Sequence, residues 1–333
     1  MRGASSAYRR LCMTTAVVTY LLIVWGGIVR VTGSGLGCDS PSGGVDSWPL
    51  CRGGLLPPWN QAGLIEFTHR WLVTVTSCLV VAVVAVTWAR YRSHRPLVVA
   101  ASATAVLFVV QIALGALTVG ATGGQKLTGG IVTLHLANAE ILLAALVFIA
   151  VTASGAQVSW RNPPAKSRLA VAGAVATYVL ILSGSNVVAQ GAGPACFGWP
   201  FCGSPGSFGT TIAQMGLASV NLLHRFVAGG VLLLLGAMVP IVRKVHRGDR
   251  GLLMSGMLIN VLLLLQIIAG ALVVEIASFP SWARGIHLAL ASALWAVVVL
   301  FALLARGAPQ EAAAGIASTT SRSLTPPSPA PAS

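Results

Sequence analysis

The chain has 333 residues, of which 56% are hydrophobic and only 8% are charged, and its mean hydropathy is +0.83. A soluble globular domain has roughly 25% charged residues, so this composition excludes an ordinary soluble protein and indicates a membrane protein. The formal net charge of +14 does not predict nucleic-acid binding, because the basic residues mark one face of a membrane.

Eight apolar segments are long enough to cross a hydrocarbon core of about 30 Å as α-helices. They lie at residues 11–31, 64–89, 97–120, 127–153, 168–189, 217–242, 251–275 and 282–305. The first segment has no evident small-residue cleavage site, so we expect a retained span rather than a signal peptide. The sequence therefore predicts an all-α polytopic membrane protein with eight transmembrane helices.

Basic residues between these segments predict the orientation of the chain. One set of loops contains Arg2, Arg9, Arg10, Arg90, Arg92, Arg95, Arg161, Lys166, Arg168, Arg243, Lys244, Arg247 and Arg250. The opposite face holds only Arg52, Lys126, Arg30 and Arg284. The positive-inside rule therefore places both termini in the cytoplasm. We expect His94 and His246, in the basic loops, to be solvated, and residues 306–333 to form a disordered cytoplasmic tail.

Two outer loops each carry a pair of cysteines. Cys38 and Cys51 follow the first span, and Cys196 and Cys202 follow the fifth. Each pair lies beside a Trp-Pro dipeptide on the side expected to be oxidising, where disulfides persist. We expect the disulfides Cys38–Cys51 and Cys196–Cys202, and a redox role for the first pair stays open. A zinc site is disfavoured because neither loop contains histidine.

The second span contains three ionisable residues, Glu66, His69 and Arg70, within the stretch EFTHR. Each ionisable side chain in a membrane span costs roughly 2.5 to 3.5 kcal/mol, so we expect a function for them. Glu66 lies three residues before His69 on the same helical face. A carboxylate at that position is able to move protons or to stabilise developing positive charge.

The second half of the chain repeats the first. EFTHR at 66–70 recurs as NLLHR at 221–225, QIALGALTV at 111–119 as QIIAGALVV at 266–274, LHLANAE at 134–140 as IHLALAS at 286–292, and the cysteine loop at 37–51 as ACFGWPFC at 195–202. Each half has an even number of spans, so both halves share one orientation. We predict two tandem four-helix bundles, residues 1–155 and 156–305, related by a pseudo-twofold axis along the membrane normal.

One histidine lies near the outer end of each even-numbered span: His69, His135, His224 and His287. Counting to the basic residues places His69, His224 and His287 roughly 28 to 32 Å from the cytoplasmic boundary. His135, about eight residues into its span, fits the same layer. A neutral imidazole is an axial ligand of haem iron, and a helical bundle can hold a haem between two histidines. The sequence therefore predicts one bis-histidine haem site in each half, whereas zinc would require a larger ligand cluster.

Two arginines directly follow histidines in the repeated motifs. Arg70 and Arg225 are candidates to contact haem propionates, because a guanidinium matches carboxylate geometry. Snorkelling to the membrane interface is the alternative interpretation.

The two halves differ in their buried acids. Glu66 is matched by Asn221, and Glu140 is matched by Ser292. Because asparagine cannot ionise, we expect the first half to be reactive and the second half to hold a haem cofactor.

The stretches GSGLGC…WPLC, EFTHR, GALTVGATGG, TLHLANAE, NLLHR and GIHLALA together resemble haem A synthases, membrane enzymes that convert haem O to haem A for cytochrome oxidase. The resemblance covers residues 11–305. It implies that haem O binds in the first half near His69 and His135 with Glu66 essential, and that His224 and His287 hold haem B. The implied reaction oxidises one porphyrin methyl group to formyl through hydroxylated intermediates, with oxygen from water.

The resemblance also implies partners. A haem O synthase would deliver the substrate within the lipid bilayer, an unidentified acceptor would take the electrons, and homo-oligomer formation stays open. Two rival functions predict other patterns. A cytochrome b-like electron carrier would favour haem ligands in both leaflets, whereas the four histidines share one. A transporter would favour broken helices at the midplane and inverted repeats, and neither is evident in the sequence.

Overall fold

The computed structural model describes residues 4–38, 50–51, 54, 56–120, 125–156, 158–159, 164, 166–202, 212–246, 248–276 and 280–307. Its long helices are α1 (Ser6–Val31), α2 (Gln61–Arg90), α3 (Arg95–Gly120), α4 (Gln125–Ala153), α5 (Ser167–Ala189), α6 (Ile212–Val245), α7 (Arg250–Glu275) and α8 (Ser281–Leu304), with a short 3-10 helix η2 (Gly193–Ala195). All 8 long helices are apolar enough to cross a membrane. The predicted all-α, multi-pass architecture is confirmed.

Polar residues outside the apolar segments set where several helices begin. The side chain of Ser5 accepts a hydrogen bond from the backbone N–H of Tyr8 at the start of α1. Asn60 accepts from Gly63 at the start of α2 in the same way. Such caps satisfy backbone donors that the first helical turn leaves free. Both helices therefore begin a few residues before the apolar segments that predicted them.

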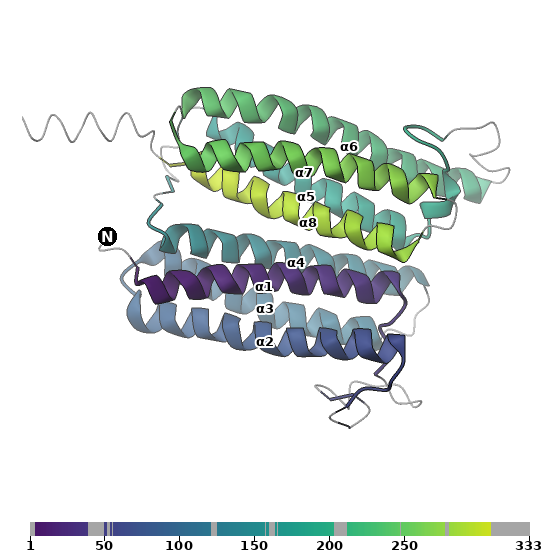
Figure 1. The fold of residues 1–333 in the computed structure, drawn as a ribbon, viewed down its shortest axis with the longest axis horizontal. Helices are drawn as coiled ribbons and strands as arrows, with labels where there is room; N and C mark the ends of the chain where they lie inside the picture. Colours follow the sequence, from purple (N-terminus) through teal and green to yellow (C-terminus); the bar gives the residue numbers. More distant parts are fainter. Residues whose placement is uncertain are drawn as a thin grey trace, which may run out of the picture.

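The helices form two groups of four that lie side by side (Figure 1). Helices α1, α2, α3 and α4 contact one another in a closed ring, and α5, α6, α7 and α8 form a second ring. The two rings meet through α1, α4, α5 and α8. The largest cluster of buried apolar side chains lies mainly in the second ring and includes Leu235, Met238, Ile259, Leu294 and Phe301.

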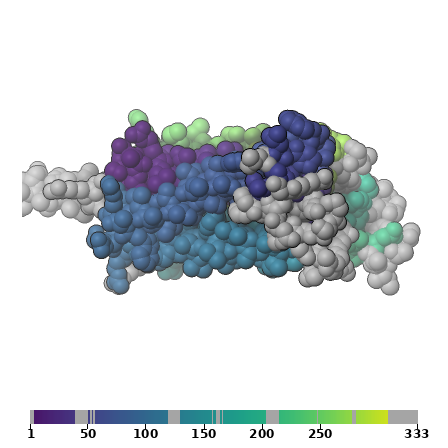
Figure 2. Space-filling view, turned by 90° about the horizontal axis from the view of Figure 1, so that it is seen from below, coloured from purple at the N-terminus to yellow at the C-terminus, as the bar shows by residue number. Residues whose placement is uncertain are grey.

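The segments that lead from α1 to α2 and from α5 to α6 lie at the same end of the molecule (Figure 1). Figure 2 shows the residues around the start of α2 (dark blue) projecting at the end opposite to the start of α1 (purple). Both cysteine pairs therefore lie at one end of the helices. The basic residues Arg90, Arg95 and Arg243 lie in or next to the opposite ends of α2, α3 and α6.

The contacts between the rings occur in matching pairs. The hydroxyl of Tyr20 in α1 donates to the carbonyl of Ala289 in α8 at 3.2 Å. The hydroxyl of Tyr178 in α5 donates to the carbonyl of Ala137 in α4 at 3.1 Å. Each alanine lies two positions after the histidine of its helix, so the two bonds are equivalent in the internal repeat. Exchanged contacts of this kind are what the predicted pseudo-twofold axis requires, and the axis itself stays a prediction.

The basic end of the molecule differs from one prediction. His246, which the sequence predicts to be solvated, is only 4% exposed, so that prediction is wrong. It directly follows α6 and packs against the end of the second ring, where burial lowers the pKa of its imidazole. Residues 308–333 of the predicted disordered tail lie outside the described part of the chain. Arg306 is held by hydrogen bonds of its backbone and side chain to Ser159.

Candidate functional site

Each of the four predicted ligand histidines lies against a glycine of the preceding helix. The pairs are Gly26 with His69, Gly115 with His135, Gly184 with His224, and Gly270 with His287, and a Cβ built on these glycines would lie 3.2, 3.3, 3.0 and 3.0 Å from the ring Cε1. At such distances a Cβ would force the imidazole to shift by a few tenths of an ångström. Glycine therefore lets each imidazole approach the preceding helix closely.

Each ring contains two of the histidines. His69 of α2 and His135 of α4 lie in one ring, and His224 of α6 and His287 of α8 lie in the other. In each ring the two histidine-bearing helices are diagonal to one another. All four side chains are half-buried. Two imidazoles therefore lie in each ring, and their joint binding of a haem stays a prediction.

Glutamine side chains occupy equivalent places beside two of the histidines. The Nε2 atom of Gln111 lies 3.2 Å from Nε2 of His135, and Nε2 of Gln266 lies 3.4 Å from Nε2 of His287. Asn138 donates to Oε1 of Gln111 at 2.7 Å, so the amide N–H of Gln111 faces the imidazole. An iron ligated through Nε2 of His135 would take the place of this hydrogen bond.

The imidazoles fit haem ligation. The Nδ1 atoms of His69, His135 and His287 are buried without a hydrogen-bond partner in the described part of the chain, so no contact there prevents Nδ1 from carrying the proton and Nε2 from binding iron. No group of three or more His, Cys, Asp or Glu side chains that could hold a metal ion occurs among the residues that the structure describes. A haem iron needs only two axial ligands from the protein, because the macrocycle supplies the others. The pairs are therefore suited to haem.

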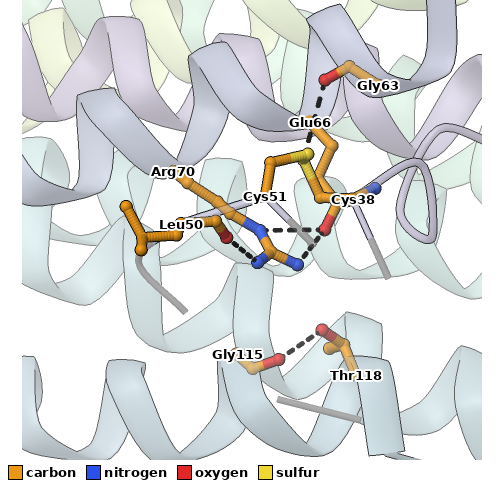
Figure 3. A network of polar contacts seen from close by, with 8 residues as sticks. All are labelled: Cys38, Leu50, Cys51, Gly63, Glu66, Arg70, Gly115 and Thr118. Atoms are coloured by element: carbon orange, nitrogen blue, oxygen red, sulfur yellow. Dashed lines mark hydrogen bonds and ion pairs between the residues drawn. A yellow bond between two sulfur atoms is a disulfide. The ribbon is translucent and has the colours of Figure 1, made fainter. Parts of the chain in front are cut away.

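Glu66 lies in a network with Arg70 and the first outer loop (Figure 3). Its Oε1 accepts from Nε and Nη2 of Arg70 at 3.1 and 2.7 Å, and its Oε2 accepts from the backbone N–H of Cys38 at 2.8 Å. Nη1 of Arg70 donates to the carbonyl of Leu50 at 2.7 Å. The Cys38–Cys51 disulfide is present in the same loop. Glu66 and Arg70 therefore attach both ends of this loop to the outer end of α2 by hydrogen bonds.

The burial of this pair explains its geometry. Glu66 is 4% exposed and Arg70 is 6% exposed. A buried charge is costly unless an opposite charge and hydrogen bonds compensate it, and here each partner supplies both. The expected proximity of Glu66 to His69 along the helix holds, but the carboxylate is directed to Arg70 and Cys38. Contact of Arg70 with a haem propionate stays a prediction.

In the second half, a similar hydrogen-bond network attaches the outer loop after α5, but it contains no acid. Nε of Arg225 donates to Oδ1 of Asn221 at 2.9 Å, and its other nitrogens donate to the carbonyls of Cys196 and Gly198. The amide of Asn221 donates to the carbonyl of Ala192 at 3.1 Å. The predicted disulfide that Cys196 forms is also present. Asparagine therefore suffices to hold an outer loop, so loop attachment alone does not explain the charge of Glu66.

The second buried acid lies elsewhere. Glu140 is fully buried where α4 meets α8, and its Oε1 accepts from the hydroxyl of Ser292 at 2.6 Å. Its backbone carbonyl accepts from Nε1 of Trp295 at 2.9 Å. Its Oε2 has no hydrogen-bond partner within the described residues. The position of Glu140 between the two rings favours a structural role over a place in either histidine pair.

The chain is similar to one family of known proteins over most of its length. The sequence model of the COX15-CtaA family, described as cytochrome oxidase assembly protein, matches residues 59–299. The chain is 30% identical over 311 residues to a protein named "Heme A synthase" from Bacillus pumilus strain SAFR-032, covering 90% of this chain and 95% of that protein. Similar proteins with the same name occur in Symbiobacterium thermophilum, 30% identical over 66% of this chain and 70% of the relative, and in Bacillus licheniformis, 26% identical over 81% and 87%. The matched residues include all four histidines and Glu66.

Proposed function

Since the chain belongs to the COX15-CtaA family of cytochrome oxidase assembly proteins, we propose that it is a haem A synthase, a membrane oxidoreductase that converts haem O to haem A. One observation carries the proposal. Two imidazole pairs, each set against helical glycines, lie in a chain that matches a "Heme A synthase" over 90% of its length. A haem substrate and a haem cofactor would each need such a pair.

The two pairs have different roles in this proposal. His69 and His135 hold haem O as the substrate, and His224 and His287 hold haem B. The difference rests on Glu66, because the second half has the neutral Asn221 at the equivalent position. When bound, haem B supplies one-electron redox chemistry.

The proposed reaction converts a methyl group to a formyl group with oxygen from water. Atom balance requires that each methyl group and one water molecule yield the formyl group, four protons and four electrons. The electrons pass to an acceptor that remains unidentified. Glu66 accepts protons at the outer end of α2, and the guanidinium of Arg70 at 2.7 Å keeps the carboxylate oriented.

The location follows from the same features. We propose that the termini are cytoplasmic and that the histidine layer lies near the extracytoplasmic side, where the disulfides would persist. Haem O would reach the first half from a haem O synthase through the bilayer. Self-association of the chain stays open.

Haem extraction tests the proposal. The chain, expressed as the only copy in cells that make haem O, should yield haem A, and the purified protein should contain haem B together with haem O or haem A. His69→Ala and His135→Ala should abolish haem A but retain haem B. Haem B in both halves, with no haem O or haem A in any preparation, would instead identify the rival function of a cytochrome b-like electron carrier.

A further inference from the structure

We propose that Ser183 is a positioning residue that fixes the tautomer of His224 and thereby helps the second half to retain its haem. The first half lacks such a contact among its described residues and is therefore able to exchange its haem. The inference rests on the proposed function. It deepens that function by assigning a structural cause to the difference between a resident cofactor and a substrate.

The hydrogen bonds of Ser183 assign the proton of His224. The hydroxyl of Ser183 donates to the carbonyl of Leu180 at 2.7 Å, and its oxygen lies 2.8 Å from Nδ1 of His224. A hydroxyl has one proton to donate, so the oxygen accepts the proton of Nδ1. Nε2 of His224 then carries the lone pair that an iron ligand needs, and the ring is held in one orientation.

The first half has a different residue at the equivalent place. A Cβ added to Gly26 or Gly184 would lie 3.2 or 3.0 Å from Cε1 of His69 or His224, so the residues before these glycines, Trp25 and Ser183, are equivalent. The indole Nε1 of Trp25 donates to the carbonyl of Ile65 at 3.0 Å. An indole N–H is only a donor, so Trp25 has no acceptor to offer to Nδ1 of His69.

The other three predicted ligand histidines have no comparable contact within the described residues. Nδ1 of His69, His135 and His287 has no hydrogen-bond partner in the described part of the chain. The second half therefore has one predicted ligand whose Nδ1 atom, the nitrogen that would not bind iron, is held by a hydrogen bond, and the first half has none. Loss of such a hydrogen bond typically lowers metal affinity by roughly 10- to 100-fold. A substrate site that must release its product benefits from the weaker arrangement, and a cofactor site from the stronger one.

Haem transfer to apomyoglobin tests the inference on the purified holoprotein. Ser183→Ala should accelerate the loss of haem B by roughly 10-fold or more and shift its low-spin electron paramagnetic resonance signal. Loss of the first-half haem, measured in the same samples, should be unchanged. Ser183→Thr, which keeps a hydroxyl, should restore both haem B retention and the signal.

Ser219→Ala is the matched control, because Ser219 in α6 also donates to a carbonyl of its own helix, that of Met215, but is exposed. It should leave haem B loss unchanged. Unaltered haem B loss and signal in Ser183→Ala, equal acceleration by Ser219→Ala, or failure of Ser183→Thr to restore retention would each overturn the inference. The retention of haem B and its low-spin signal are measured independently of haem A production, so a chain that makes no haem A would refute the proposed function without deciding this result.

Discussion

Glu140 of α4 accepts a hydrogen bond of 2.6 Å from Ser292 of α8, and each of these residues lies five positions after the histidine of its helix. Two residues that are equivalent in the internal repeat therefore contact one another across the boundary between the rings. Equivalent residues meet in this way only near an axis that relates the two halves. The contact supports the predicted axis and gives Glu140 a place in the assembly of the halves.

We predict that Glu140→Gln preserves the protein and that Glu140→Ala destabilises it. Glutamine keeps the size of the side chain and an oxygen that can accept from Ser292. Alanine leaves that buried hydroxyl without its partner, at a cost of about 1–3 kcal/mol, and also opens a cavity. Thermal unfolding in detergent should show a lower midpoint for Glu140→Ala only. A Glu140→Gln protein that folds, binds haem B and makes no haem A would instead give Glu140 a role in the reaction.

Much of the architecture could be predicted because each element depends on local sequence. The eight spans follow from the lengths of the apolar segments, and the disulfides follow from cysteines that share a short loop. The histidine pairs followed from the repeat, since NLLHR and EFTHR place a histidine at the same position in each half. These features do not require knowledge of how distant helices pack.

Contacts between helices were not predicted. The pairing of Ser183 with His224 joins two helices whose relative rotation is set by packing, and the repeat in α1 and α5 is too divergent to reveal the equivalence of Trp25 and Ser183. The ion pair between Glu66 and Arg70 could have been predicted from the sequence, because the two residues have the i, i+4 spacing of a helical ion pair. The attachment of Glu66 to Cys38 depends on the path of the outer loop, which the sequence does not specify.

The glycines that face the histidines should not tolerate alanine. In Gly184→Ala the new Cβ would lie 3.0 Å from Cε1 of His224, so the ring must shift, with a cost of about 1–3 kcal/mol for overpacking. We expect a diminished or altered low-spin haem B signal in the purified protein. Gly229→Ala in α6 is the control, because nothing lies within 4 Å of its Cβ position. An unchanged haem B signal in Gly184→Ala would show that the imidazole does not depend on this close approach.

The third outer loop, which leads from α5 to α6 and contains Cys196 and Cys202, should loosen in Arg225→Lys. One ammonium group cannot replace the separate contacts of the guanidinium with Asn221, Cys196 and Gly198. Loss of one hydrogen bond to a charged donor costs about 1.5–3 kcal/mol, so reduction and labelling of Cys196 and Cys202 should accelerate roughly 10-fold or more.

The control for the loop experiment is Arg30→Lys, which changes an exposed arginine at the same end of the molecule. Its labelling rate should equal that of the unaltered protein. Equal labelling rates of Cys196 and Cys202 in Arg225→Lys and Arg30→Lys would contradict the role of Arg225 in attaching this loop.

The last prediction concerns the charge of Glu66. Asn221 holds the third loop without a charge, so we expect Glu66→Gln to assemble, to keep the contact with Arg70 through one oxygen, and to bind haem B. If the carboxylate accepts protons during oxidation of the methyl group, this variant should accumulate haem O or a hydroxylated intermediate in place of haem A. Asn221→Gln should leave haem A production largely intact.

Arg70→Lys separates the charge of Glu66 from the attachment of the loop at Leu50. This variant keeps a positive charge beside the buried carboxylate, and the bond of Glu66 to Cys38 remains, but one ammonium group cannot also replace the contact of the guanidinium with the carbonyl of Leu50. If proton transfer is the essential role, chromatographic haem analysis should show less residual haem A in Glu66→Gln than in Arg70→Lys, with both proteins present at equal levels. Near-normal haem A from Glu66→Gln would assign the reactive role to another residue, because a neutral amide cannot accept the protons that the oxidation releases.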